Sequence, residues 1–237
     1  MRKFGLALAL LFSVATLSAQ KQINDANAEK RNVSGFHGIN VSSGVELFLT
    51  QGDAEAVAVS SAGGEFNQDI KTEVKNGILH IGFDHMKFKN LKTNKKLKAY
   101  VSIKNIDLLD AASGAQVKVD GKLKAAKMEV EASSGAMIEG EFDVQNMDVD
   151  QSSGSIIRMK GDVADLKVEG SSGSIFEGYD LSTSTTEAGC SSGAIVRVTA
   201  NKELNVKASS GGSVSYKGTA VIRNIKTGSG GNVSRKG

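Results

Sequence analysis

The chain of 237 residues contains no proline and no tryptophan, and its single cysteine is Cys190. One cysteine cannot form a disulfide within the chain, so a disulfide-stapled scaffold is excluded. The absence of proline and tryptophan, together with 27 glycines, suits a repeat of short strands and turns. After the apolar run near the N-terminus, no stretch is long and apolar enough to cross a membrane as a helix.

The N-terminal segment has the pattern of a secretory signal peptide. Arg2 and Lys3 precede an apolar run from Phe4 to Leu17, and small residues surround Ala19. We therefore predict that residues 1–19 are removed and that the protein is exported, to the periplasm, the outer surface or the extracellular medium. A membrane anchor is the less favoured alternative, because the run is too short to span a bilayer comfortably and no cysteine follows it for lipid attachment.

The rest of the chain is nearly neutral. The formal net charge of +3 becomes +1 without Arg2 and Lys3, since no acidic residue is lost with them. No global field therefore favours nucleic acid as a partner. We expect residues 20–32 to form a flexible polar leader and residues 33–237 to form one domain, with N-terminal strands at 33–105 and regular repeats at 106–237.

A motif built on Ser-Ser-Gly recurs seven times in the second half of the chain, and subtraction of the positions gives intervals of 21, 19, 19, 20, 18 and 19 residues. Its glycines are Gly114, Gly135, Gly154, Gly173, Gly193, Gly211 and Gly230. A fixed period near 20 is typical of a solenoid, in which each repeat stacks only on its neighbours. Helical solenoids need longer units, and Ser-Ser-Gly would break their helices. We predict an all-β fold: a right-handed parallel β-helix with about seven Ser-Ser-Gly rungs.

Alternation within each repeat indicates which side chains form the core. Apolar or small residues stand seven, five and three positions before the glycine and one and three positions after it, as in Met128, Val130, Ala132, Ala136 and Ile138. These positions share one parity, so they face one side of an extended chain. Each large side chain contributes roughly 1.5–3 kcal/mol on burial, and one rung has only a few, so rungs must stack to be stable.

The second serine of each motif has the same inward parity. Strict alternation therefore predicts a column of inward hydroxyls that neighbouring rungs could complete as a ladder, and a larger side chain there would overpack it. The serines of this column are Ser113, Ser134, Ser153, Ser172, Ser192, Ser210 and Ser229.

Four large apolar residues break the polar pattern of the opposite parity. Two positions after successive glycines stand Met137, Ile156, Ile175 and Ile195. If alternation continues through the motif, these residues, here termed the apolar column, form an exposed patch of the kind that marks a partner interface. We favour the alternative, a β-bulge that shifts the register by one residue and buries them, because adjacent apolar pairs such as Ile156-Ile157 suggest a tight corner.

The N-terminal strands follow a different pattern. Alternating apolar residues continue from Val33 to Ile103, interrupted by Gln51-Gly52-Asp53, Gly63-Gly64 and Asn76-Gly77. Asn-Gly between alternating segments predicts a hairpin. No 20-residue period is evident here. The segment is therefore either a set of irregular early rungs or a small sheet that covers an open end of the solenoid.

Three runs carry a resemblance to a known family. Phe36–Val41, Gly44–Gly52 and Ile70–Ile81, followed by the Ser-Gly rungs, resemble the bacterial head GIN domain family over about residues 33–235. The resemblance implies a secreted or cell-envelope β-solenoid of Bacteroidetes-type bacteria, labelled an autotransporter adhesin. It supplies no catalytic residues.

Gly189-Cys190-Ser191-Ser192-Gly193 matches the G-x-S-x-G pattern of a hydrolase nucleophile. That motif needs a strand–turn–helix context and a base histidine later in the chain. No histidine follows Ser191, so we expect an ordinary repeat and no catalytic role. Cys190 takes the small inward position of its sister repeats, which predicts a buried thiol.

His80, Asp84 and His85 are candidate metal ligands, but residues five apart face opposite sides of a strand and no spaced third ligand follows. We expect no metal and no cofactor, and we interpret His37 as a surface or turn residue. Residues 85–98 hold six lysines around Phe88 and could meet a polyanion, although a solvated loop is the preferred explanation. The segment lacks arginines and further aromatic side chains, so nucleic-acid binding is not expected.

A stripe of carboxylates is expected on adjacent rungs. Stacked carboxylates repel unless they are solvated or bridged by a cation such as Ca²⁺. We prefer a role in solubility to calcium binding, because Lys167 interrupts the stripe. Its members are Glu129, Glu131, Asp148, Asp150 and Glu169.

These features favour a non-enzymatic interaction protein of the cell envelope, an adhesin that binds a glycan or another envelope protein and is open to homo-oligomerisation. A lyase or hydrolase acting on polysaccharides is the alternative of a different class. Such an enzyme needs paired acids in a groove, and Arg158, Arg197 and Arg223 accompany no such pair. A purely structural envelope component is the third interpretation.

Overall fold

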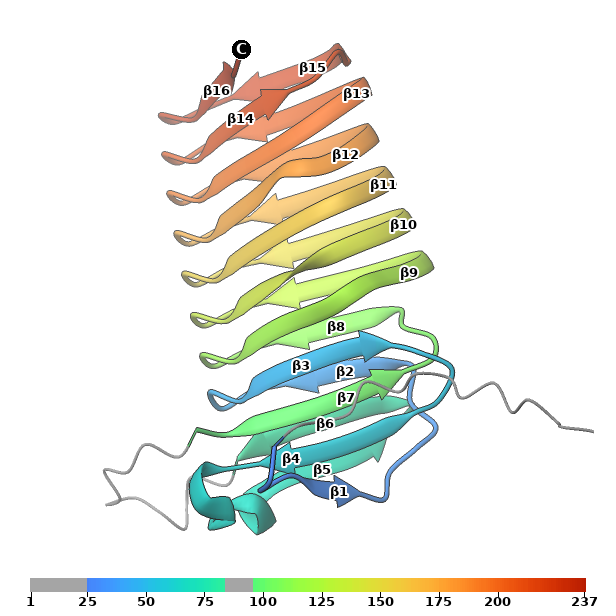
Figure 1. The fold of residues 1–237 in the computed structure, drawn as a ribbon. Coiled ribbons are helices and arrows are strands. Elements are labelled where there is room, and N and C mark those ends of the chain that lie inside the picture. The colour runs from blue at the N-terminus through green and yellow to red at the C-terminus, as the bar shows by residue number, and fades with distance from the viewer. Residues whose placement is uncertain (1–24, 84–95) are drawn as a thin grey trace, which may run out of the picture.

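In the computed structural model, residues 25–83 and 96–237 are described, and they form sixteen strands of one continuous sheet wound into a β-solenoid (Figure 1). The predicted all-β solenoid of about seven rungs is confirmed. The predicted signal peptide and most of the lysine-rich segment 85–98 lie outside the described residues. Two 3-10 helices of three residues each, η1 (Ala62–Gly64) and η2 (Asn67–Asp69), are the described helices, and neither has the length to cross a membrane.

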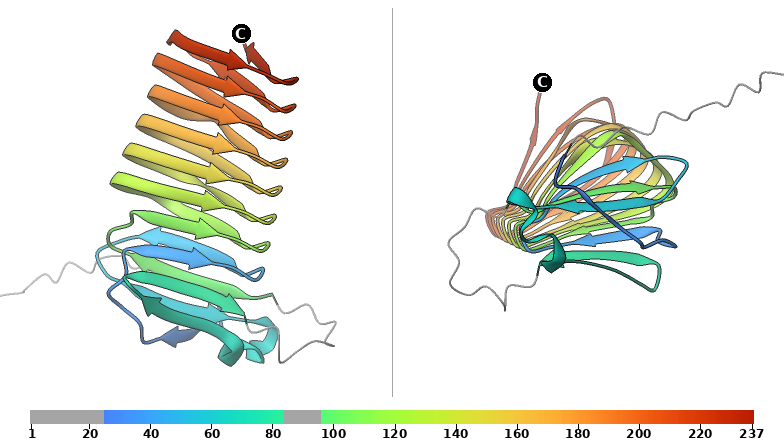
Figure 2. Two further views of the ribbon diagram at one scale, coloured as in Figure 1. Left: turned by 180° about the vertical axis from the view of Figure 1, so that it is seen from behind. Right: turned by 60° about the horizontal axis from the view of Figure 1, so that its bottom comes forward.

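The regular rungs are long parallel strands that run out along one face, bend and return along the opposite face (Figure 2). In β10, residues 137–141 lie on what we term the outgoing face and residues 146–151 on the return face. Each long strand pairs in register with the strands of the rungs before and after it. These strands are β9 (Gln116–Ala132), β10 (Met137–Gln151), β11 (Ile156–Gly170), β12 (Ile175–Cys190) and β13 (Ile195–Ala208).

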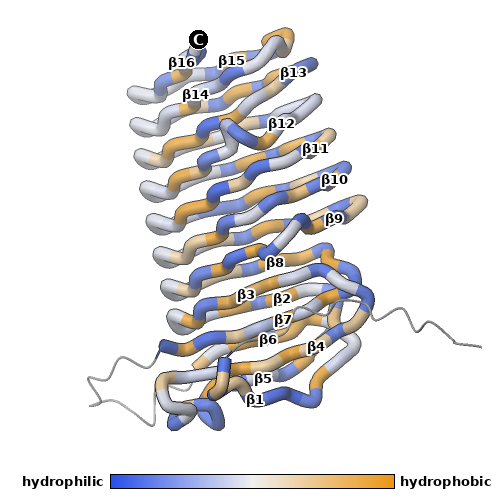
Figure 3. Tube along the Cα trace, in the orientation of Figure 1, coloured by the Kyte–Doolittle hydropathy of each residue, from blue (hydrophilic) through white to orange (hydrophobic). Residues whose placement is uncertain are grey.

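Alternation along these strands places the core between the two faces. Ile138 stacks between Val117 and Ile157 and is fully buried, as is Val149 on the return face. Both Gln145 and Asn146 are exposed, because the strand bends there and the parity changes. The alternation of apolar and polar residues is visible along the rungs in Figure 3. The predicted core positions are therefore confirmed.

Each Ser-Ser-Gly closes a rung as a tight turn with two residues at positive φ. In the turn at 133–136, φ is 52° at Ser134 and 72° at Gly135, and the Ala136 N–H donates to the Ser133 carbonyl at 3.0 Å. Two positive φ angles with this hydrogen bond are features of a type I′ turn, and glycine adopts them without steric cost. The Gly135 N–H donates to the Ser153 carbonyl of the next rung at 3.0 Å, so the turns form a backbone ladder.

The predicted inward ladder of serine hydroxyls is wrong. All seven second serines (Ser113, Ser134, Ser153, Ser172, Ser192, Ser210 and Ser229) are exposed, with φ between 46° and 53°. Alternation holds only for extended backbone, and positive φ turns these side chains outward. In two of these turns a buried hydroxyl belongs instead to the residue after the glycine. Ser155 Oγ donates to the Ala132 carbonyl at 3.0 Å, and Ser174 Oγ donates to the Gln151 carbonyl at 3.3 Å.

The N-terminal strands include two further rungs, which stack out of sequence order. The strands β2 (Gly38–Val41) and β3 (Glu46–Gln51) form one rung, and β6 (Ile78–Phe83) and β7 (Lys98–Ile103) form the other. The β2–β3 rung lies between the β6–β7 rung and the strands β8 (Leu108–Ala111) and β9, and all these pairings are parallel. An eighth turn, Ser42-Ser43-Gly44, joins β2 to β3, with the Gly44 N–H donating to the Ser113 carbonyl at 3.0 Å.

Three antiparallel strands cover the N-terminal end of the stack (Figures 1 and 2). The strand β4 (Ala56–Ser60) pairs with β7, β1 (Glu29–Arg31) pairs with β4, and β5 (Ile70–Lys75) pairs with β6 across the predicted Asn76-Gly77 hairpin. Early rungs and a covering sheet are thus both present. The prediction of a flexible leader at 20–32 is wrong for β1, because this segment forms a strand that pairs with the edge of β4.

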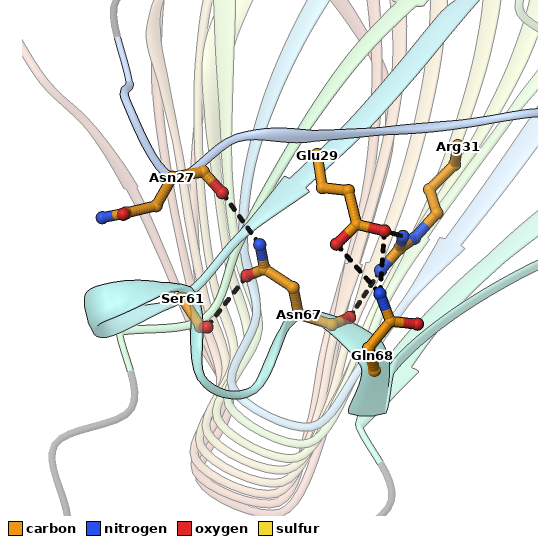
Figure 4. A network of polar contacts seen from close by, with 6 residues as sticks. All are labelled: Asn27, Glu29, Arg31, Ser61, Asn67 and Gln68. Atoms are coloured by element: carbon orange, nitrogen blue, oxygen red, sulfur yellow. Dashed lines mark hydrogen bonds and ion pairs between the residues drawn. The ribbon is translucent and has the colours of Figure 1, made fainter.

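Polar side chains connect the segment that contains β1 to the loop that contains η1 and η2 (Figure 4). Asn67 is buried, donates from Nδ2 to the Asn27 carbonyl at 2.8 Å and accepts from Ser61 Oγ at 2.9 Å. Arg31 donates to the Asn67 carbonyl and pairs with Glu29, which also accepts from Gln68. These groups satisfy buried polar atoms where the repeat pattern has stopped.

The C-terminal rung consists of β14 (Ser213–Lys217), β15 (Val221–Thr227) and β16 (Asn232–Arg235). The strand β14 pairs with the outgoing part of β13, and β15 pairs with its return part. The strand β16 pairs with β14. Unlike the N-terminal end, this end has no further strand laid over it among the described residues.

Candidate interaction surface

The apolar column lies on the outgoing face of four consecutive strands. Met137 pairs in register with Ile156, Ile156 with Ile175, and Ile175 with Ile195. All four side chains are half-buried, whereas the residue that follows each of them is fully buried. The bulge alternative is therefore wrong, and the column faces outward as alternation predicts. The side chains are not fully exposed, because neighbours about 4.8 Å apart shield one another.

Polar residues bound the column at both of its ends. Gln116 stands next to Met137 on the N-terminal side, and Glu46 follows it. On the C-terminal side Ile195 is followed by Ser213 and then by Asn232. The apolar column is therefore limited to four rungs.

A row of alternating charges runs beside the column, two residues further along each strand. Its members are Lys118, Glu139, Arg158, Glu177 and Arg197, in strand order. Arg197 forms an ion pair with Glu177, and Lys118 Nζ lies 2.7 Å from Glu46 Oε1, which raises the pKa of Lys118. In-register parallel strands would otherwise stack like charges, so the alternation of sign avoids repulsion.

A second charge cluster lies further along the outgoing face of the first long strands. Glu141 lies between Lys122 Nζ at 3.1 Å and Lys160 Nζ at 3.6 Å. The Lys122 contact lowers the pKa of Glu141, and the same contact raises the pKa of Lys122. Exposed ion pairs of this kind stabilise the fold little, because water screens the attraction between their charges.

The return face carries the predicted carboxylate stripe. Asp110, Glu131, Asp150 and Glu169 occupy one register position on successive strands, and Glu129 and Asp148 occupy a neighbouring one. Desolvation raises the pKa of Asp110, and desolvation together with the charge of Asp110 raises the pKa of Glu131. Among residues 25–83 and 96–237, no three His, Cys, Asp or Glu side chains converge as metal ligands would. Calcium binding therefore gains no support from the geometry.

The remaining candidate residues lie apart from these surfaces. Ser191 begins the tight turn between strands β12 and β13, so the strand–turn–helix context of a nucleophile elbow is absent. Cys190 is buried as predicted, and burial raises the pKa of its thiol to about 11. His37 is exposed and contacts Asp107 at 2.7 Å, whereas His80 is half-buried on β6. Asp84 and His85 lie outside the described residues.

Two shallow depressions interrupt the surface. One, of about 330 Å³, lies on the return face and is lined by Glu187, Asn205, Lys207, Asn224 and Lys226 among others. The second, of about 240 Å³, lies at the bend. Both are open to solvent rather than enclosed as a ligand cleft usually is.

Comparisons with known proteins agree with this architecture. A sequence model of the family described as "Putative auto-transporter adhesin, head GIN domain" matches residues 35–220. A search of curated proteins finds no significant match.

Several solved structures have the same fold. One described as a putative adhesin from Bacteroides fragilis is 15% identical with a TM-score of 0.80, and the match covers 88% of this chain and 96% of that one. A putative adhesin from Parabacteroides merdae is 12% identical with a TM-score of 0.65, covering 89% and 95%. A protein from Parabacteroides distasonis, described as a putative lipid binding protein, is 18% identical with a TM-score of 0.65, covering 90% and 98%. At these identities the likeness shows the shared fold.

Proposed function

The chain belongs to the head GIN domain family, described as auto-transporter adhesins, and from this membership we propose that it is a non-enzymatic adhesion protein of the cell envelope. Its partner would be another envelope protein or a glycan. The predicted signal peptide supports export, and the family supports a location in the envelope or on the surface.

The observation that carries this proposal is the apolar column. A stack of Met137, Ile156, Ile175 and Ile195 on a flat, outward face, bordered by ion pairs, has the apolar centre and polar rim of a protein interface. The column contains no aromatic side chain. We therefore favour a protein partner over a glycan.

The test is a substitution in the centre of the column. We expect Ile175→Asp to abolish binding of the purified protein to immobilised envelope proteins. The side chain is half-buried, so the melting temperature of the protein should fall only modestly, and circular dichroism checks that the variant is folded. Ala126→Asp, which introduces the same charge at an exposed site on β9, is the matched control and should bind normally. Equal binding by both variants would contradict a role for the column.

Two further assays address the alternatives. A glycan array with the same two variants distinguishes a carbohydrate partner from a protein partner. A screen for cleavage of acidic polysaccharides tests the enzymatic alternative, and reproducible turnover would overturn the non-enzymatic proposal. Esterase activity that disappears in Ser191→Ala would do so too.

A further inference from the structure

The C-terminal end of the solenoid has an open sheet edge. Among the described residues, β15 pairs only with β13 and β16 pairs only with β14, so the outer N–H and C=O groups of both strands lack strand partners. Every long strand from β9 to β12 is paired along both edges. Such an edge is a template for the addition of another strand.

Apolar side chains are exposed along β15. Val221, Ile222 and Ile225 are 57%, 41% and 43% exposed. Ile222 pairs with Leu204 and Ile225 pairs with Val206, and both of these partners are at most 1% exposed. Ile222 and Ile225 thus continue core columns, but no rung covers them. A strand added about 4.8 Å further along the axis would bury both.

The charge of this end is of one sign. Residues 204–237 contain no Asp or Glu and six basic residues, namely Lys207, Lys217, Arg223, Lys226, Arg235 and Lys236. Lys207 and Arg223 pair with carboxylates of earlier rungs, and Lys217 and Lys236 lie over the Tyr179 ring at 4.5 and 5.1 Å. Lys226 follows Lys207 in register, so two cations are stacked with no acid between them. The position that an added strand would place beside Lys226 therefore favours an acidic side chain.

We propose that this edge binds an extended acidic segment of a partner protein by β-strand addition along β15. Main-chain hydrogen bonds to the open edge would supply much of the affinity, as in other strand-addition complexes. Apolar side chains of the segment cover Ile222 and Ile225, and its acidic side chains, at alternate positions, lie near Lys226. The basic residues also disfavour pairing between two copies of this end, because like charges would meet. This surface is separate from the apolar column.

The probe for the test is a fluorescein-labelled nine-residue peptide of alternating Glu and Val. We expect it to raise the fluorescence anisotropy on binding to the purified protein and to slow hydrogen exchange of β15 amides that point away from β13. Replacing Glu by Lys in the peptide should abolish binding. N-methylation of alternate peptide amides should also abolish it, because that change removes main-chain donors and leaves the charge intact.

Variants of the protein locate the site. Lys226→Glu should weaken binding of the acidic peptide at least tenfold, and Ile225→Asp should abolish it, whereas Ala126→Asp should bind normally. Lys226 is exposed, so its variant keeps the test informative if Ile225→Asp fails to fold, which circular dichroism would detect.

Several results would overturn the proposal. The first is no binding of the acidic peptide, and the second is binding that N-methylation does not change, which would indicate charge attraction alone. Self-association in sedimentation velocity that Ile225→Asp abolishes would make a second copy of the chain the occupant. Binding to phosphatidylglycerol vesicles without binding to the peptide would make a lipid surface the occupant.

Discussion

The two ends of the solenoid terminate the same core in different ways. At the N-terminal end, β4 and β5 lie antiparallel over the β6–β7 rung, and Leu79 and Ile81 beneath them are at most 1% exposed. At the C-terminal end, β15 and β16 are parallel edge strands whose core residues stay accessible. A parallel stack has no intrinsic stop, because each rung presents the edge that the next one needs. Closure requires strands that depart from the repeat.

The difference extends to the charge and to the buried groups. Residues 25–75 contain eight acidic and four basic residues, whereas residues 204–237 contain six basic residues and no acidic one. The covered end also buries Ser60, Ser61 and Asn67, and none of their buried side-chain polar atoms lacks a hydrogen-bond partner. The covered end has its own irregular structure, whereas the open end is simply another rung.

The largest expected effect is a contrast between equivalent core substitutions. Leu79→Ala removes a fully buried side chain from the covered end and should lower the free energy of unfolding by about 2–5 kcal/mol. Ile222→Ala at the open end should cost less than about 1 kcal/mol, because that side chain is already partly hydrated. Urea denaturation followed by circular dichroism measures both. Equal losses would show that Ile222 is buried in solution.

The cap should depend on one buried amide. Asn67→Ala leaves the Ser61 hydroxyl and the Asn27 carbonyl without this partner, and we expect a loss of about 1–3 kcal/mol. Gln68→Ala removes exposed hydrogen bonds to Glu29 and should stay within about 0.5 kcal/mol. Denaturation together with hydrogen exchange of β1 tests the pair. A neutral Asn67→Ala would mean that the network does not hold the cap.

The tight turns allow the same change in the middle and at the open end. Ser172 and Ser229 have φ of 51° and 46°, so Ser172→Val should cost about 1–2 kcal/mol through backbone strain. Ser229→Val should affect global stability less, because an end rung can fray locally. Ser172→Asn is the control and should be close to neutral, since Asn tolerates positive φ. A cost of Ser172→Val that Ser172→Asn shares would contradict strain as the cause.

The smallest expected effect is on the pH dependence of stability. The pKa values of Asp110 and Glu131 are raised, so the folded state binds more protons and stability falls as the pH rises through their range. The pKa values of Asp25, Glu29 and Glu73 at the covered end are lowered by hydrogen bonds, and their contribution is lost as the pH falls through those lowered values.

The melting temperature should therefore rise slightly from pH 7 to about pH 5 and decrease below about pH 4. Glu131→Gln should reduce the rise of the melting temperature between pH 7 and 5 and leave its decrease at acid pH unchanged. A rise of the same size in that variant would show that the carboxylate stripe is not its cause.

Several features were predictable because they depend on local repetition. The period near 20 residues predicted the solenoid, and parity predicted that Ile138 and Val149 are buried. The preferred expectation that a bulge buries Ile156 was wrong. Parity was wrong at Ser172 and its equivalents, because alternation assumes extended backbone and the turn has positive φ. The signal for this lay in the sequence itself, since the glycine that follows each of these serines favours such a turn.

The covered end was not predictable in the same way. Ser42-Ser43-Gly44 has the sequence of the other turns, but it precedes Ser113-Gly114 by more than three periods and so shows no regular spacing. The β2–β3 rung, which contains this turn, has the β6–β7 rung on one side and β8 on the other. Both neighbours come from later parts of the chain, and parity alone does not state which strands pair across such a separation.

The amino-acid sequence by itself determined the period, the inward positions of the regular rungs and the tight turns, because each of these depends on residues within one rung and its copies. Only the tertiary structure decided the spatial order of the first rungs, the pairing of β1 and the contrast between the two ends. Those features arise from contacts between distant segments. These features depend on which strand edges remain unpaired after the regular rungs have stacked, and such edges form only when the chain folds.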